Sequence, residues 1–351
     1  MPEWVEWIVI FKHIFMQHIL SKRFWFFIIS GGLALFSIGM IFFGNLNLGI
    51  DMTGGTQSEY RYTDYEFSQE TLATQAQEVA LSIDETQNII TTVNLYKITG
   101  EESFVVEAGF TRNLSEEEIE SYKVDYRDTL EQSFQELGSI ELTKYTNIGA
   151  SFGDYIRNTA FTTLIIAIVG IALYIAYTFS GTVSGISSLS FALITIITLF
   201  HDVLISTGLY ILTSSFFPHF QIDTFFITAL LTILGYSIND TIVIFDRIRS
   251  NLQEFGGKGK NLHEIIELSV SQTLTRSIYT SLTLAFVLLC ILIFGPESIG
   301  GFTLAMMFGT IVGTYSSIFI ASPLLFEIHK NTVLSEYVKR EELSEEDKMV
   351  V

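Results

Sequence analysis

The stretch LLTILGYSINDTIVIFDRIRS, residues 230–250, joins an apolar run to a basic tail and carries two adjacent polar residues, Asn239 and Asp240. Asp240 is the one charged residue between Leu230 and Phe245. An ionisable side chain inside a bilayer is costly and normally faces the interior of a helix bundle or water. The stretch therefore predicts a membrane helix that belongs to a bundle and holds a buried carboxylate.

The composition of the whole chain agrees with a membrane protein. Hydrophobic residues make up 49% of the 351 residues and charged residues only 16%, with a mean hydropathy of +0.42, whereas about a quarter of a soluble domain is charged. Two uncharged runs, Phe24–Phe43 and Thr159–Phe179, have the length of roughly 20 residues that a bilayer requires. Four further candidates, some with an embedded polar group, are Ile186–Leu212, Ile222–Phe245, Ile278–Phe294 and Phe302–Phe326. We expect six transmembrane helices.

The net charge of −19 is concentrated in one segment. Residues 45–157 contain 21 acidic and 7 basic residues, a balance of −14, and no apolar run long enough to cross a membrane. This segment is expected to be a water-exposed domain, and its acidity argues against a nucleic-acid partner. The Lys and Arg residues in the short loops and at the chain ends predict that both termini lie in the cytoplasm. These basic residues are Lys12, Lys22, Arg23, Arg247, Arg249, Lys258, Lys260, Lys330, Lys339 and Arg340.

These features predict an order of segments along the chain. The segments are a cytoplasmic N-terminal part (1–23), a first transmembrane helix (24–44), an extracytoplasmic domain (45–157), a five-helix transmembrane bundle (158–327) and a cytoplasmic tail (328–351).

The extracytoplasmic domain has a readable pattern of elements. Alternating or β-branched runs predict strands at residues 56–63, 88–99, 103–110 and 139–149. Helices are expected after the N-cap Ser68 and after Ser115, where Ser115 and Glu118 have the spacing of a capping box. The order β-α-β-β-α-β is that of a ferredoxin-like unit. The predicted fold is therefore a polytopic α-helical membrane protein with six transmembrane helices and one extracytoplasmic α+β domain between helices 1 and 2.

Polar residues stand out at three places inside the predicted spans: His201-Asp202, Asn239-Asp240 and Arg276. Amides and carboxylates can join membrane helices by hydrogen bonds. For His201-Asp202 we favour such a buried structural network, because no cationic partner is evident. One His and one Asp are too few ligands to indicate a metal site.

Asp240 and Arg276 enter adjacent helices that share one loop, so an ion pair between them is expected. Burial opposes the charged form of a carboxyl, whereas a nearby guanidinium favours it. Such a pair could act as a protonation switch that moves a helix or as a static strut that specifies packing. The residues alone leave both readings open.

Five stretches resemble the SecF family of the bacterial protein-export machinery. They are LGIDMTGGT (48–56), ALITIITLFHDVLISTG (192–208), LTILGYSINDTIVIFDRIRSNL (231–252), TLTRSIYTSLTLAFVLL (273–289) and GFTLAMMFGTIVGTYSSIFIASPLL (301–325). The resemblance covers roughly residues 20–330 in the expected order. The family usually has a Pro in the stretch before the second span, which reads NIGASFGDYI here and has none.

The resemblance implies a function and a site. SecF and its partner SecD are related to the resistance-nodulation-division exporters, associate with the SecYEG channel in the bacterial cytoplasmic membrane, and use a proton or sodium gradient to draw out a preprotein after SecA has pushed it. In that family the Asp of a Ser-x-Asn-Asp motif and the Arg that opens the fifth span are implicated in ion coupling, which correspond to Asp240 and Arg276. The supporting intramembrane residues would be Ser237, Asn239, His201 and Asp202, and the motif after helix 1 would comprise Gly49, Asp51, Gly54 and Gly55.

Two other functions remain open at this stage. The chain could be a structural subunit that stabilises the assembly of SecD and SecYEG without transducing energy, or a lipid or small-molecule exporter, which the modest outer domain argues against. An enzyme driven by ATP is disfavoured, because the sequence has no Gly-x-x-x-x-Gly-Lys-Ser/Thr loop. No cofactor is expected.

Overall fold

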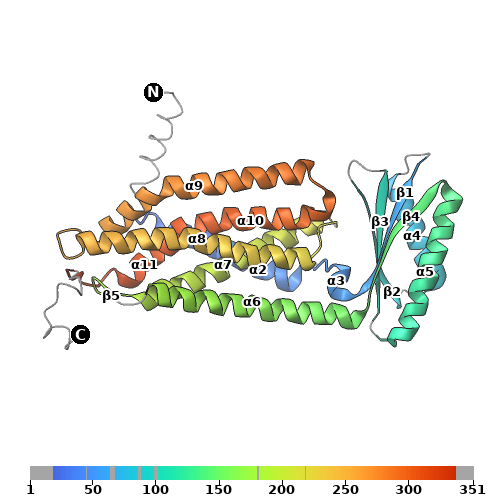
Figure 1. The fold of residues 1–351 in the computed structure, drawn as a ribbon, viewed down its shortest axis with the longest axis horizontal. Coiled ribbons are helices and arrows are strands. Elements are labelled where there is room, and N and C mark those ends of the chain that lie inside the picture. Colours follow the sequence, from blue (N-terminus) through green and yellow to red (C-terminus); the bar gives the residue numbers. More distant parts are fainter. Residues whose placement is uncertain are drawn as a thin grey trace, which may run out of the picture.

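The protein has a long helical bundle at one end and a small α+β domain at the other (Figure 1). The structure is a computed structural model that describes residues 19–336, except 45, 64–67, 86–87, 99–101, 112, 180–181 and 218. Most of the expected N-terminal segment, most of the C-terminal tail and the turn between the strands expected at 88–99 and 103–110 lie outside the described residues.

Six helices of the described chain are long and apolar enough to cross a membrane, as the sequence predicts. They are α2 (Arg23–Phe43), α6 (Ala150–Thr178), α7 (Ser188–Phe216), α8 (Thr224–Phe255), α9 (Leu262–Phe294) and the composite helix α10 (Gly300–Ser316), η2 (Ser317–Ala321) and α11 (Ser322–His329). η2 is a π-helical stretch. A short hairpin, β5 (Thr182–Val183) and β6 (Ile186–Ser187), precedes α7, and the 3₁₀ turn η1 (Glu297–Ile299) precedes α10.

Three of these helices extend furthest past the predicted apolar runs. α6 begins at Ala150, α8 continues to Phe255 and α9 begins at Leu262. Hydropathy detects only the part of a helix that suits lipid, whereas backbone hydrogen bonding continues as far as caps and packing allow. At the start of α9, for example, Asn261 and Glu264 form a capping box.

The α+β domain has the predicted ferredoxin-like topology. Its strands are β1 (Gly55–Tyr62), β2 (Ile90–Lys97), β3 (Ser103–Phe110) and β4 (Ile140–Ile148), in the antiparallel order β2-β3-β1-β4. Helices α4 (Gln69–Ile83) and α5 (Glu116–Leu137) cover one face of the sheet (Figure 1). The Ser68 N-cap and the capping box of Ser115 and Glu118 are both present.

The two faces of this sheet have different roles, because side chains alternate along a strand. On one face, Tyr60 and Phe104 of the sheet pack against Phe134 of α5 in an aromatic core. The ring centroids of Phe104 and Phe134 are 5.1 Å apart. The other face carries Gln57 and Glu107, which line a cavity of about 490 Å³ between the sheet and the bundle.

The domain–bundle junction is built by the residues around α3 (Ile50–Thr53), which follows α2. Leu48 forms a parallel β-bridge with Ile222, just before α8. The Asp51 carboxylate accepts a hydrogen bond of 2.7 Å from the Thr224 hydroxyl at the first turn of α8. The start of α8 is therefore tied directly to the α+β domain.

Glycines allow the junction to be this tight. Gly54 has a φ of +77°, in the region that favours glycine, and a Cβ there would lie 2.7 Å from the Cα of Ala150. A Cβ on Gly55 would lie 2.4 Å from the carbonyl oxygen of Ala108, and one on Gly49 would lie 3.0 Å from the Cβ of Asp223. The GIDMTGG motif thus joins three parts of the chain at close range.

Inside the bundle, α10 is the central helix and packs against α7, α8 and α9. Gly309 and Gly313 face α8, where a Cβ would lie 2.2 Å from Cγ1 of Ile233 and 2.9 Å from the Cβ of Ser237, respectively. Small residues four apart permit such close helix contact in membranes. The first and last spans also meet, since Arg23 forms an ion pair of 2.9 Å with Glu327.

We expect Gly309→Leu to destabilise the bundle by about 1–3 kcal/mol or more, because the new side chain must push α10 away from α8. Thermal unfolding of the detergent-purified protein measures this effect. The matched control is Gly170→Leu on α6, where a Cβ meets nothing within 4 Å. Equal melting temperatures for the two variants would contradict the assigned packing.

The carboxyl of Glu107 provides a test of the junction. Its side chain is only 5% exposed and accepts hydrogen bonds from Gln221, from the Tyr96 hydroxyl at 3.1 Å and from the Gln57 amide at 3.2 Å. Burial, with a smaller effect of the Asp223 and Asp51 carboxylates, raises the pKa of Glu107 despite these donors.

A raised pKa in the folded state means that folding favours the protonated carboxyl. This contribution to stability is complete below the ordinary Glu pKa and is lost as the pH rises through the folded-state pKa. We therefore expect Glu107→Gln to raise the melting temperature at pH values above the folded-state pKa of Glu107. The variant should also show a smaller fall of the melting temperature as the pH rises through that pKa. Glu141→Gln, at an exposed position of β4, is the control. An unchanged pH dependence in Glu107→Gln would contradict this origin of the effect.

Candidate functional site

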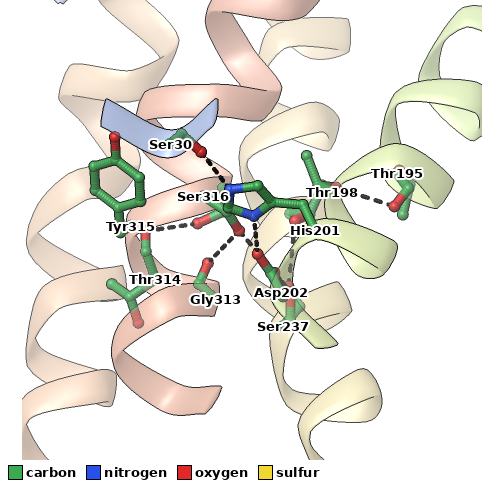
Figure 2. A network of polar contacts seen from close by, with 12 residues as sticks. Ser30, Thr195, Thr198, His201, Asp202, Ser237, Gly313, Thr314, Tyr315 and Ser316 are labelled. Carbon is green, nitrogen blue, oxygen red and sulfur yellow. Dashed lines mark hydrogen bonds and ion pairs between the residues drawn. The ribbon is translucent and has the colours of Figure 1, made fainter. Parts of the chain in front are cut away.

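Asp202 lies in the middle of α7 and has the most buried carboxylate among the described residues of the bundle. Its exposed fraction is 0%. Its Oδ2 accepts hydrogen bonds from the Ser237 hydroxyl on α8 at 2.5 Å and from the Ser316 hydroxyl on α10 at 2.7 Å. Figure 2 shows these hydroxyls converging on the carboxylate. Asp202 therefore joins three helices.

His201 extends this network to a fourth helix. Its Nδ1 lies 2.8 Å from Oδ1 of Asp202, and its Nε2 is hydrogen-bonded to the Ser30 hydroxyl of α2 (Figure 2). The imidazole is partly accessible, at 12%, whereas Ser30 is buried. Both carboxylate oxygens of Asp202 thus have hydrogen-bond partners, which is the condition for a charged group to be tolerated in a membrane interior.

Asp240 lies one helical turn after Ser237 on α8 and is also buried. Its Oδ2 has no hydrogen-bond partner among the described residues, and neither has the nearby Ser277 hydroxyl of α9. The groups that act electrostatically on this carboxyl are Ser277 and the Arg276 guanidinium. In contrast to Asp202, the Asp240 carboxyl has free capacity for a proton, a cation or a donor from another chain.

The expected ion pair between Asp240 and Arg276 is not formed in the described part of the chain, where no contact of 4.0 Å or less joins them. The reason is helical geometry. Ser277 and Ser281, four residues apart, face the bundle, whereas Arg276 lies about 100° around the helix from Ser277 and is exposed. Asp240 and Arg276 belong to adjacent helices, as predicted, but the Asp240 side chain is buried in the bundle and the Arg276 side chain is exposed.

Asn239 is likewise exposed and forms no bridge between helices of the described chain. It lies on an outward face of α8 that also includes Thr228, Thr232 and Gly235. Hydropathy could not distinguish Asn239 from Asp240, because neighbours in sequence differ by only one step around the helix.

The structure thus brings Ser237, His201 and Asp202 together and places Asp240 one turn away. The motif residues Gly49, Asp51, Gly54 and Gly55 lie apart from them, at the domain–bundle junction. Sequence reasoning missed Ser30 and Ser316, because single serines are common in membrane helices. Among the described residues, no group of three or more His, Cys, Asp or Glu side chains could hold a metal ion.

Comparison with known proteins gives this arrangement a family. Residues 129–331 match the family model "Protein export membrane protein SecD/SecF, C-terminal". The protein translocase subunit SecF of Sebaldella termitidis is 35% identical over 312 residues, which cover 89% of this chain and 92% of that protein. SecF of Helicobacter pylori strain 26695 is 34% identical over 296 residues, covering 84% and 81%.

The fold has a solved counterpart. The crystal structure of SecDF, a translocon-associated membrane protein from Thermus thermophilus, aligns with a TM-score of 0.70 and 28% identity over 89% of this chain. A second structure, SecDF in a super-membrane-facing form, aligns with a TM-score of 0.61. This chain spans 38% of the length of those SecDF chains. On the strength of the matched family model and of relatives aligned over most of its length, the chain belongs to the SecF family of protein translocase subunits.

Proposed function

We propose that this protein is an auxiliary subunit of the Sec preprotein translocase that works with SecD in the bacterial cytoplasmic membrane. It acts at the SecYEG channel, downstream of SecA, and couples a proton or sodium gradient to the late stage of preprotein export. The observation that carries the proposal is the buried Asp240 carboxyl, whose Oδ2 has no hydrogen-bond partner among the described residues.

Such a carboxyl suits ion coupling. A buried carboxylate without donors is costly, and binding a proton or a cation relieves that cost by cancelling its charge. Asp240 lies on α8, whose first turn is hydrogen-bonded to Asp51 at the domain–bundle junction. A change of charge at Asp240 that shifts α8 would therefore act on the α+β domain through one continuous helix.

The outward faces of α8 and α9 support a protein partner inside the membrane. Asn239 and Arg276 are exposed there, and polar side chains at this depth normally face protein or water rather than lipid. SecD, the partner that the SecDF structures suggest, would supply groups for both. In that assembly Arg276 could reach Asp240 or a carboxylate of SecD.

The proposed orientation places both termini in the cytoplasm. Arg23, at the start of α2, forms an ion pair with Glu327 of α11, and α11 lies at the end of the bundle away from the α+β domain (Figure 1). The first span therefore begins on the side of the membrane where the last span ends. Arg247 and Arg249 lie toward the same end of α8, and the positive-inside rule assigns such an end to the cytoplasm. The acidic α+β domain then lies outside the cytoplasm.

We expect Asp240→Asn to reduce preprotein release to the level measured without an ion gradient, because the amide cannot exchange a proton or hold a cation. Release from vesicles that contain this protein, SecD and SecYEG measures the effect, with Asp246→Asn as control at an exposed position of the same helix. Parental release by an assembled Asp240→Asn complex would contradict a coupling role. Failure of that complex to assemble would instead favour a structural role.

We expect Arg276→Leu to weaken association with SecD by more than about tenfold, since loss of one member of a buried charge pair costs about 2–5 kcal/mol. Arg276→Lys should have an intermediate effect, because lysine keeps the charge and lacks the planar guanidinium. Affinity is measured between the purified subunits in detergent, with Arg247→Leu as control. Unchanged affinity in Arg276→Leu would place the partner on another face.

A further inference from the structure

A groove of about 390 Å³ lies between α9 and α10, which pack side by side in the bundle (Figure 1). Leu282 of α9 and Ile311 of α10 line this α9–α10 groove, and they are 62% and 56% exposed. The groove is therefore open on the outside of the bundle, where a membrane protein meets lipid or a partner helix. Most of the residues that line it are apolar, so it suits a hydrocarbon group better than a charged ligand.

Aromatic contacts fix one wall of the groove. The Tyr315 hydroxyl of α10 donates a hydrogen bond of 3.2 Å to the Phe26 carbonyl of α2. The ring of Phe319 lies 5.4 Å from that of Tyr315 and 4.6 Å from that of Phe26. Phe319 belongs to the π-helical stretch η2, and such stretches are frequent at functional sites. This wall is thus held by contacts between α2, α10 and η2.

The groove has the length of one leaflet of a bilayer. On α9 it extends from Leu274 to Ala285, which corresponds to about 16 Å of helix, and half of the hydrocarbon core measures about 15 Å. α9 ends at Phe294, about 30 Å beyond Leu274. Leu274 therefore lies near one boundary of the hydrocarbon core and Ala285 near its middle. In the proposed orientation, this half of the core is the cytoplasmic leaflet.

Basic residues lie at the cytoplasmic end of the groove. Ile19 lines the groove, and its carbonyl accepts a hydrogen bond of 3.2 Å from the backbone N–H of Lys22, whose side chain is exposed. Arg23 and Lys330 both form ion pairs with Glu327. Three cations and one anion give these four charged residues a net charge of +2. Basic groups beside membrane helices on the cytoplasmic side attract anionic lipid headgroups.

The groove lies on the face of α9 away from the proposed contact with SecD. Leu274 and Ile278, which line the groove, are each two residues from Arg276, or about 200° around the helix. SecD at Arg276 would therefore leave the groove open to lipid.

We propose that the α9–α10 groove binds one acyl chain of an anionic phospholipid from the cytoplasmic leaflet, with the headgroup phosphate at Lys22. The chain fills the apolar groove along its length, and the Lys22 ammonium attracts the phosphate as a point charge. This inference rests on the proposed orientation and not on the ion-coupling role of Asp240.

The test uses the complex with SecD in vesicles of phosphatidylethanolamine that contain phosphatidylglycerol with a photoreactive diazirine in one acyl chain. After illumination, peptide mass spectrometry locates the labelled residues. We expect label on Leu282 and Ile311, and a loss of about tenfold in Ala285→Trp, because the larger side chain occupies the groove. Leu193→Trp, at a position of α7 that is 53% exposed, is the matched control and should keep the label.

The headgroup is tested by charge. Lys22→Gln should reduce labelling about fivefold, the effect of one basic group at an anionic membrane surface, whereas Lys258→Gln in the loop between α8 and α9 should not. In the parental protein, excess unlabelled phosphatidylglycerol should remove the label and phosphatidylcholine should not. This competition requires no substitution, so it decides the proposal even where Ala285→Trp does not fold.

Three results would overturn the proposal. They are equal competition by the two lipids, label no stronger in the groove than on Leu173, an exposed residue of α6, and cross-links that place SecD or residues 1–18 in the groove. Access of a membrane-impermeant maleimide to Ser21→Cys from the outer side would overturn the leaflet assignment. Parental preprotein release by Asp240→Asn would refute the coupling function alone, since labelling does not depend on release.

Discussion

The structure depends on how a carboxylate is satisfied inside a membrane bundle. Lipid offers no hydrogen-bond donors, so every donor to Asp202 comes from the protein itself. Hydroxyls of α8 and α10 and the imidazole of α7, which is bonded in turn to α2, meet this need. Four helices are thereby held at one point, and the contact of α10 with α8 at Gly309 and Gly313 brings Ser316 and Ser237 within reach of the same oxygen.

The two buried carboxylates on α7 and α8 are therefore different in kind. Both carboxylate oxygens of Asp202 have hydrogen-bond partners, one of which is Ser237. Asp240 lies one turn after Ser237 and has a carboxylate oxygen without a donor in the described chain. A satisfied carboxylate specifies packing, and an unsatisfied one can bind an ion. The contrast gives a physical basis for assigning a structural role to Asp202 and ion exchange to Asp240.

The α+β domain is connected to this machinery at the start of α8. One face of its sheet forms the aromatic core, and the opposite face turns Glu107 toward the junction, where Gln221 donates to it. Three residues after Gln221, the Thr224 hydroxyl donates a hydrogen bond to the Asp51 carboxylate. The start of α8, the helix that carries Asp240, is thus hydrogen-bonded to the junction with the α+β domain. One helix therefore connects the membrane bundle to the domain.

The sequence by itself determined the number of spans, the ferredoxin-like order of strands and helices, and the identity of the polar residues inside the spans, because hydropathy, alternation and capping are local properties. Only the tertiary structure decided which of those polar residues meet. Arg276 and Asn239 face outward while Ser30 and Ser316 face Asp202, since a rotation of about 100° per residue and the choice of neighbouring helix assign each side chain to its surroundings. Both depend on how helices distant in sequence pack together, which no local pattern records.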